Sequence, residues 1–432
     1  MVVIKDHKYM KPNIFNKALF IGSLLSLVLF VITVLLKQID PIEPLLILGF
    51  VCLALASFWT EKYRGFTYSL SILAAVSVSM SYPALFIEVG DFKFKLLIVP
   101  LLQIIMFGMG SQMSLKDLAG VIKMPKGVIV GVLCQFTIMP IMGFLIATVF
   151  QFSPEIAAGI VLVGSSPSGL ASNVMSFLAK ANLALSITLT AVATLLSPLM
   201  TPFLMKIFAG QMIEIHFLSM MVGIFNMVIL PICAGLIFNL FSNGGHTFKQ
   251  RIIQMAAFLS IILFKNYIGV LASAEGGQLL GTPLLWNLGF FWILPVIGAF
   301  LFKWLAGGRK EILEKMLSFV SMAGIAIIII VITAAGRDSL MTIGAILMLA
   351  CLLHNIFGYT LGYTFSKLLG MEERDCRTIA LEVGMQNGGL ASGLALQMGK
   401  VATVGLAPAI FGPMMNITGS SLATWWRAKP TK

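Results

Sequence analysis

Long apolar runs, separated by short polar connections, dominate the chain. The run at 18–36 is typical, because it is about 20 residues long, the length of a helix that crosses a bilayer. A membrane barrel would instead show strands of about 10 residues in which apolar and polar positions alternate. The pattern therefore predicts spanning helices over residues 18–36, 42–60, 66–90, 96–113, 127–150, 155–179, 182–207, 215–242, 252–273, 286–306, 312–335, 341–366, 378–398 and 402–426.

Two of these fourteen segments carry the weakest signal. The segment 42–60 has prolines near its start, and the segment 252–273 contains Lys265. Removing two neighbouring segments would leave the orientation of all the others unchanged, so the sequence allows twelve spans as well as fourteen. We expect Lys265 to reach the membrane surface from a span end rather than to face an internal cavity.

The composition agrees with a membrane protein. Hydrophobic residues make up 59% of the chain and charged residues 11%, whereas soluble domains have roughly 25% charged residues. Soluble enzymes, nucleic-acid-binding proteins and disordered chains are thereby excluded as descriptions of the whole chain.

The basic residues indicate an orientation. When the segments alternate from a cytoplasmic N-terminus, most of the 29 Lys and Arg residues fall in cytoplasmic loops, as the positive-inside rule requires. The net charge of +12 then reflects topology. We expect a multi-pass protein of the inner or plasma membrane, with both termini in the cytoplasm and the lipid bilayer, not nucleic acid, as its partner.

A short internal repeat relates the two halves of the chain. The sequence Gly-Leu-Ala-Ser occurs at 169–172 and again at 389–392, and Gln135 and Asn355 lie at the same offset. The two segments that contain the copies run in opposite directions across the membrane, and each carries helix-breaking residues near its middle. Inverted repeats with discontinuous helices are typical of secondary transporters, whose binding sites lie at the breaks.

Glu382 is the acidic residue that lies well inside a predicted span, about 7–8 Å past its cytoplasmic end. A carboxylate within the membrane is costly and is a functional-site hypothesis by default. The alternative is an ion pair with Arg377, close to the membrane surface. The Gln-Asn-Gly-Gly run at 386–389 follows directly and favours the functional interpretation.

Uncharged oxygen ligands occur in neighbouring segments. They are Gln135 before the first helix break, Ser172 and Asn173 after it, and Ser186, Thr190 and Thr194 on one face of the next span. For a single Ser or Thr, a hydrogen bond to the carbonyl four residues earlier is the plainer explanation, but a face of three favours a binding site. Such oxygens suit a hard cation such as Na⁺, and a proton on Glu382 is the competing interpretation. We expect His354 to pack between helices rather than to relay protons.

Three motifs resemble the bile acid:sodium symporter family. They are Ser-Gly-Leu-Ala-Ser-Asn-Val at 168–174, Ala-Leu-Ser-Ile-Thr-Leu-Thr at 184–190 and Leu-Glu-Val-Gly-Met-Gln-Asn-Gly-Gly-Leu-Ala at 381–391. The resemblance covers roughly 66–242 and 311–426. It implies an all-α polytopic membrane protein with two inverted five-helix repeats and crossing broken helices, here with extra helix pairs.

The resemblance also implies ligands. The first Na⁺ site would be formed by Ser172, Asn173, Ser186, Thr190 and Glu382, and the second by Gln135, Glu382, Val383, Met385 and Gln386, with Val383 and Met385 binding through backbone carbonyls. The substrate would meet Asn387, Asn416, Ser168 and Gly169. Leu170 and Met415 stand where many members of the family have a hydroxyl residue and a His, so we expect a more apolar substrate pocket.

These features together predict a sodium-coupled symporter, not an enzyme, for an organic anion such as a bile acid or a small carboxylate. A proton-coupled transporter or exporter of organic acids is the alternative. Four parts are expected along the chain. They are an extra N-terminal helix pair at 1–65, the first repeat and the start of the second at 66–242, an inserted helix pair at 243–310, and the remainder of the second repeat with the cytoplasmic C-terminus at 311–432.

Overall fold

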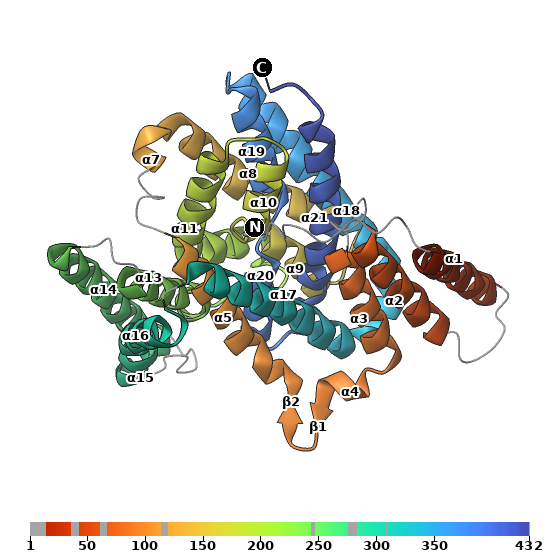
Figure 1. The fold of residues 1–432 in the computed structure, drawn as a ribbon, viewed down its shortest axis with the longest axis horizontal. Coiled ribbons are helices and arrows are strands. Elements are labelled where there is room, and N and C mark those ends of the chain that lie inside the picture. Colours follow the sequence, from red (N-terminus) through yellow and green to blue (C-terminus); the bar gives the residue numbers. More distant parts are fainter. Residues whose placement is uncertain are drawn as a thin grey trace.

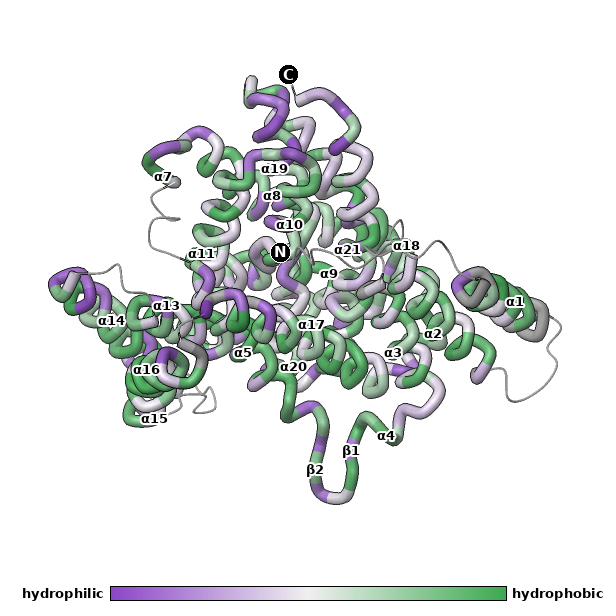
Figure 2. The backbone as a smooth tube through the Cα atoms, in the orientation of Figure 1, coloured by the Kyte–Doolittle hydropathy of each residue, from purple (hydrophilic) through white to green (hydrophobic). Residues whose placement is uncertain are grey.

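The computed structural model is almost entirely helical, and its helices are apolar along most of their length (Figure 2). It describes residues 14–35, 43–60, 67–113, 120–242, 247–274, 283–307 and 309–431. Within these residues, the predicted segments fall on one helix or on consecutive helices, apart from the end of 66–90, and eight helices are long and apolar enough to cross a membrane. The prediction of an all-α polytopic membrane protein is confirmed. The predicted cytoplasmic N-terminus lies outside the described residues.

The first half of the chain runs to the end of the long helix α11. Its elements are α1 (Ile14–Leu35), α2 (Glu43–Trp59), α3 (Thr67–Ser81), α4 (Ala84–Ile87), β1 (Glu88–Val89), β2 (Phe92–Lys93), η2 (Phe94–Leu97), α5 (Ile98–Gln112), α7 (Gly120–Lys123), α8 (Pro125–Val149), α9 (Pro154–Ser165), α10 (Ala171–Leu178) and α11 (Leu183–Ala209). The second half contains two π-helical segments, η3 and η4, within longer helices. Its elements are α12 (Phe217–Ile224), η3 (Phe225–Ile229), α13 (Leu230–Ser242), α14 (Phe248–Ala274), α15 (Leu284–Leu288), η4 (Gly289–Ile293), α16 (Leu294–Ala306), α17 (Lys310–Ala335), α18 (Arg337–Leu368), α19 (Glu373–Gly384), α20 (Gly388–Gln397) and α21 (Leu406–Arg427).

The predicted helix over 66–90 is wrong at its C-terminal end. There the chain forms α4 and then an antiparallel hairpin, in which Val89 pairs with Phe92. Pro83 precedes α4, and a proline cannot donate the backbone hydrogen bond that a continuing helix needs. Gly90 turns the hairpin with a φ of +57°, a conformation that glycine adopts readily.

The helices pack into two groups (Figure 1). We call α8–α11 with α18–α21 the core bundle, and α3, α5, α12, η3, α13 and α17 the panel. The pair α1 and α2 packs beside α3, whereas α14, α15 and α16 pack beside the panel at the opposite end of the molecule. The core helix α20 reaches the panel, where it packs against α5, α12 and α17.

Two broken helices cross at the centre of the core bundle. The first break separates α9 from α10, and the second separates α19 from α20. At the crossing, the Gly169 N–H donates to Met385 O at 2.8 Å and the Asn387 N–H donates to Pro167 O at 2.8 Å. Two backbone groups that each helix leaves unpaired at its own break are therefore satisfied by the other break, as burial away from water requires.

Candidate functional site

Glu382 lies in the last part of α19, and only 2% of its surface is exposed. Its Oε1 atom accepts hydrogen bonds from Ser172 Oγ at 2.6 Å and from Ser186 Oγ at 2.5 Å, and its Oε2 atom accepts one from Thr190 Oγ1 at 2.9 Å. These side chains come from α10, α11 and α19. The carboxylate therefore joins three separate helices of the core bundle.

Asn173 completes this cluster from α10. Its Oδ1 atom lies 2.8 Å from Ser186 Oγ and 3.3 Å from Thr190 Oγ1. Thr194, one turn further along α11, instead donates to the backbone carbonyl of Thr190 at 2.6 Å. The structure thus brings together the five residues of the first predicted Na⁺ site, and leaves Thr194 outside it.

The oxygens of this cluster outnumber the hydrogens that can bridge them. Ser172, Ser186 and Thr190 each have one hydroxyl hydrogen, but the three hydroxyls make five oxygen–oxygen contacts of 2.5–2.9 Å with Glu382, Asn173 and the Gly169 carbonyl. Two of these contacts must therefore lack a hydrogen at any moment. Such an excess of acceptor oxygens creates a negative potential at the cluster and favours a bound cation.

The position of α11 relative to α19 follows from its first residues. Asn182 caps α11 by accepting from the Leu185 N–H at 3.2 Å, and its Nδ2 donates to Asp375 Oδ1 at 2.8 Å. The Asn182 N–H also donates to Thr378 Oγ1 on α19 at 2.9 Å. Because Thr378 lies one turn before Glu382, this cap sets the register that aims Ser186 at the carboxylate.

The residues of the second predicted site gather beside the crossing. Gln135 of α8 donates through Nε2 to Gln386 Oε1 at 2.7 Å and to Ser166 O at 3.0 Å. Gln386 in turn donates to Val383 O at 2.6 Å. The Val383 carbonyl is available because Asn387, which would pair with it in an unbroken helix, donates to the other break instead.

One oxygen at this second group has no partner. Gln135 Oε1 is buried and accepts no hydrogen bond from the described residues. The carbonyl of Met385 accepts from Gly169 but has a second lone pair. An unpaired buried acceptor costs about 1–3 kcal/mol. A cation bound to Gln135 Oε1 would offset this cost.

The four residues predicted to meet the substrate differ in the hydrogen bonds that they form. Asn387 Oδ1 caps α20 by accepting from the Leu390 N–H at 3.0 Å, and Asn416 Nδ2 donates to Gly412 O within α21 at 3.0 Å. Ser168 Oγ is buried with no hydrogen-bond partner among the described residues. The Gly169 N–H is used by the crossing. Ser168 lies beside Glu382 at the breaks, whereas the two asparagine side chains are held by bonds within α20 and α21.

Two alternatives from the sequence are decided by geometry. Arg377 does not pair with Glu382, because its Nε atom donates to Glu373 Oε1 at 2.8 Å. His354 packs edge-on against Phe411, and its Nε2 atom lies 2.8 Å from Met139 O, as expected of a helix-packing histidine.

Lys265 and Asn355 add findings that the sequence did not give. The prediction for Lys265 is wrong, since this residue lies in the interior of α14 with its side chain fully buried, where α14 packs against α12 and α13. Asn355 donates to Gly384 O at 2.7 Å, which supports the second break as Gln135 supports the first. The shared offset of Gln135 and Asn355 was the available signal.

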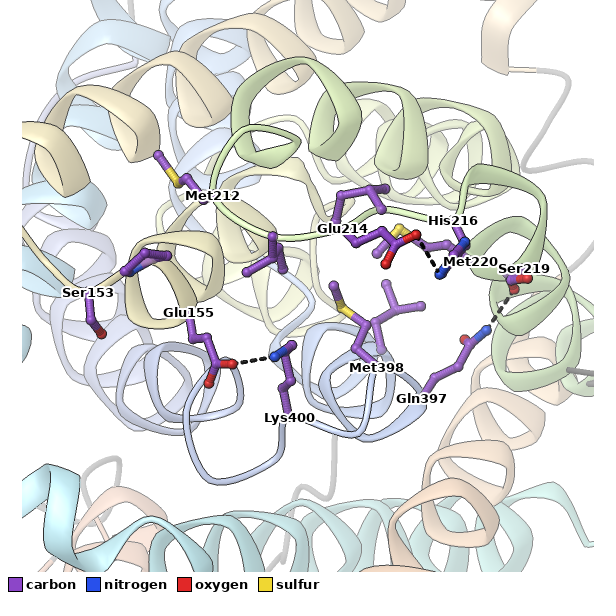
Figure 3. A pocket seen from close by; sticks show the side chains of 14 residues that line it. Ser153, Glu155, Met212, Glu214, His216, Ser219, Met220, Gln397, Met398 and Lys400 are labelled. Atoms are coloured by element: carbon purple, nitrogen blue, oxygen red, sulfur yellow. Dashed lines mark hydrogen bonds and ion pairs between the residues drawn. The ribbon is translucent and has the colours of Figure 1, made fainter. Parts of the chain in front are cut away.

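A cavity of about 820 Å³ lies at the far end of α20 from the crossing (Figure 3). We call it the vestibule; the beginnings of α9 and α12 and the end of α20 line it. Lys400 forms an ion pair with Glu155 at its edge, and His216 lies 3.4 Å from Glu214. Charged groups of both signs therefore surround this cavity, whereas hydroxyls, carboxamides and one carboxylate form the central cluster. No group of three His, Cys, Asp or Glu side chains that could hold a transition metal occurs in the described part of the chain.

Comparison with known proteins adds independent findings. A family model described as the Sodium Bile acid symporter family matches residues 99–282. The uncharacterized sodium-dependent transporter YocS of Bacillus subtilis (strain 168) is 32% identical over 373 residues, which cover 86% of this chain and 94% of that protein. A probable chloroplastic sodium/metabolite cotransporter of Arabidopsis thaliana is 30% identical over 332 residues, or 77% of this chain and 67% of that protein. The human ileal sodium/bile acid cotransporter is 26% identical over 294 residues, which cover 68% of this chain and 67% of that protein.

Proposed function

The chain belongs to the sodium bile acid symporter family, and from this premise we propose that it is a sodium-coupled symporter of an organic anion. The family is one of transporters, so the chain is not an enzyme. The observation that carries the proposal is the excess of oxygens over bridging hydrogens around Glu382. The anion would be a bile acid, as in the name of the human relative, or a small carboxylate.

The proposed Na⁺ sites use only oxygen ligands. Ser172, Asn173, Ser186, Thr190 and Glu382 would hold one ion, and Gln135, Glu382, Val383, Met385 and Gln386 a second. Each bound Na⁺ supplies a positive charge that lets the oxygens approach one another without shared hydrogens. Carboxylate, amide, hydroxyl and carbonyl oxygens are ligands that hard cations prefer.

Coupling would follow from which elements these ligands join. Ser172 and Asn173 follow the first break, Glu382 precedes the second, and the two breaks are bonded to each other. When a bound Na⁺ draws the ligands of the first site together, α10 and α19 hold the crossing in one geometry. The N-termini of α10 and α20 then present their positive dipole ends beside it. We propose that the anion binds there, near Ser168, Gly169, Asn387 and Asn416.

The proposed architecture is that of two inverted repeats in a plasma or inner membrane, with cytoplasmic termini. Gln135 and Asn355 support it, because each donates to a backbone carbonyl at the break of its own half. The helix pairs within 1–65 and 243–310 would be additions to a core formed by 66–242 and 311–432. Alternating access would come from movement of the core bundle against the panel.

The test is uptake of candidate carboxylates into vesicles that contain the purified protein, with and without an inward Na⁺ gradient at constant ionic strength. We expect uptake to require Na⁺. The Glu382→Gln variant should lose Na⁺-dependent uptake and Na⁺-dependent thermal stabilisation, because the shared charged ligand is gone. Glu88→Gln, the same substitution on the exposed hairpin, is the matched control and should keep both.

Two results would contradict the proposal. Unchanged Na⁺ stabilisation in Glu382→Gln would remove Glu382 from the cation sites. Uptake that is indifferent to Na⁺ and driven by a pH gradient would replace sodium coupling by proton coupling, with Glu382 as the residue that binds the proton.

A further inference from the structure

A second cavity, of about 830 Å³, lies beside the panel. Residues of α5, η3 and α13 line it together with residues of α15, η4, α16 and the end of α20. The lining is mainly apolar and includes the rings of Phe107, Phe238, Trp286 and Phe290. Most small-molecule sites in proteins have about this size, roughly 300–1,000 Å³, and this kind of lining.

Carboxamides are the polar groups of this cavity. No charged side chain lines it among the described residues, and its polar side chains are those of Gln103, Asn226, Asn287 and Gln397. An ion taken from water into such a site without a counter-charge loses its hydration with little in return. Carboxamides, however, form good hydrogen bonds with uncharged groups. The cavity therefore suits a neutral molecule, unlike the anion proposed for the crossing.

Two of the carboxamides are fixed by bonds to the backbone. Gln103 Nε2 donates to Asn226 O at 3.0 Å, and Gln397 Nε2 donates to Ser219 O at 2.6 Å. Because the NH₂ group of Gln103 is engaged and this side chain is only half-buried, its oxygen is well placed to accept a hydrogen bond from a ligand.

The backbone that lines this cavity is also unusual. The described chain contains two π-helical segments, and both line this cavity. From η3 come Asn226 and Met227, and from η4 come Phe290 and Phe291. Single π turns inside helices occur frequently at functional sites. Two such turns at one cavity are an observation independent of the chemistry of the lining.

We propose that this cavity binds an uncharged amphipathic molecule, whose hydrocarbon body packs between the aromatic rings and whose hydroxyl donates to Gln103. The site is distinct from the cation cluster, because none of the residues proposed to hold Na⁺ lines this cavity. A bound molecule contacts α20 of the core bundle, α5 and α13 of the panel, and the added helices α15 and α16 together. It therefore holds the core bundle and the panel in one relative position.

Binding can be measured with a brominated monoacylglycerol, because bromine quenches tryptophan fluorescence on contact and Trp286 lines the cavity. With the full chain in detergent micelles, we expect saturable quenching that falls sharply in Trp286→Phe. An N-acyl taurine with the same brominated chain carries a permanent charge and should bind at least about tenfold more weakly. Quenching that never saturates, or equal affinity for the charged compound, would overturn the proposal.

Gly298 and Gly269 provide a matched pair of variants. A side chain at Gly298, which lines the cavity, would first meet Phe238 at 3.8 Å, whereas one at Gly269 on α14 would meet nothing within 4 Å. Gly298→Leu should weaken binding at least about tenfold by filling the cavity, and Gly269→Leu should not. Equal affinity in both variants would refute the site.

Photolabelling of the unmodified protein provides a measurement that needs no variant. A monoacylglycerol with a diazirine in its chain should label peptides around α5 and around α15 to α16, and unlabelled monoacylglycerol should suppress that labelling. Labelling spread evenly over the apolar helices would show that the cavity is not a site.

Discussion

Gly169 allows the closest approach in the crossing, and its replacement by alanine tests whether the crossing controls cation binding. A Cβ atom at this position would lie 2.8 Å from the carbonyl oxygen of Gln386, 0.6 Å inside the 3.4 Å at which ordinary contact begins. The obstacle is backbone, so it cannot be relieved by rotating a side chain. The two breaks must therefore separate.

The magnitude follows from what that separation removes. Overpacking of this kind costs about 1–3 kcal/mol in total, which includes the weakening of the two hydrogen bonds of the crossing. We expect Gly169→Ala to lower the free energy of unfolding by about 1–3 kcal/mol. Met385 O is displaced together with the second break, so the Na⁺ concentration at half-saturation should also rise. A loss of about 1–3 kcal/mol in Na⁺ binding corresponds to a rise of about 5- to 150-fold.

The assay is thermal unfolding of the purified protein over a Na⁺ titration, with choline replacing Na⁺ at constant ionic strength. Gly412→Ala is the control, because a Cβ atom added at Gly412, on the neighbouring helix α21, would meet nothing within 4 Å. This variant should leave the Na⁺ titration unchanged and raise stability slightly, as Gly→Ala does in a helix. A Gly169→Ala protein that titrates with Na⁺ like the unmodified chain would refute the reasoning.

Two further predictions concern single side chains. Thr190→Val removes a hydroxyl from Glu382 and should weaken Na⁺-dependent stabilisation, whereas Thr194→Val, whose hydroxyl bonds within its own helix, should not; equal effects would argue against the cluster. Arg377→Gln breaks a buried ion pair with Glu373 and should lower the free energy of unfolding by about 3–5 kcal/mol, measured by thermal or denaturant unfolding. Lys367→Gln removes the exposed partner of the same carboxylate and should change stability little. A larger loss of stability in Lys367→Gln than in Arg377→Gln would contradict the prediction.

The sequence predicts the fold class well because a membrane imposes strong rules. Apolar runs of span length must be helices, and a carboxylate within a span needs polar partners. The meeting of Glu382 with Ser186 and Thr190 could be anticipated, since the spacing of the two hydroxyls puts them on one helix face. Their role in Na⁺ binding stays a prediction.

Other features depend on contacts that no local pattern encodes. Thr194 continues the same face but bonds within its helix, because its side chain lies one turn beyond Glu382. Lys265 is buried because other helices cover α14. The hairpin at 88–93 required a glycine turn that hydropathy averaging hides. The cavity beside the panel depends on how α15 and α16 pack, and nothing in their apolar sequence indicates it.

The crossing also has a consequence for how the protein is made. Residues 166–169 are synthesised long before 385–387, yet two backbone groups of each break are satisfied by the other. Until α19 and α20 have entered the bilayer, the Gly169 N–H and the Pro167 carbonyl have no such partner, and each unpaired backbone group in lipid costs several kcal/mol. The first half is therefore inserted as an unfinished structure, and its crossing is completed only when α19 and α20, near the end of the chain, arrive.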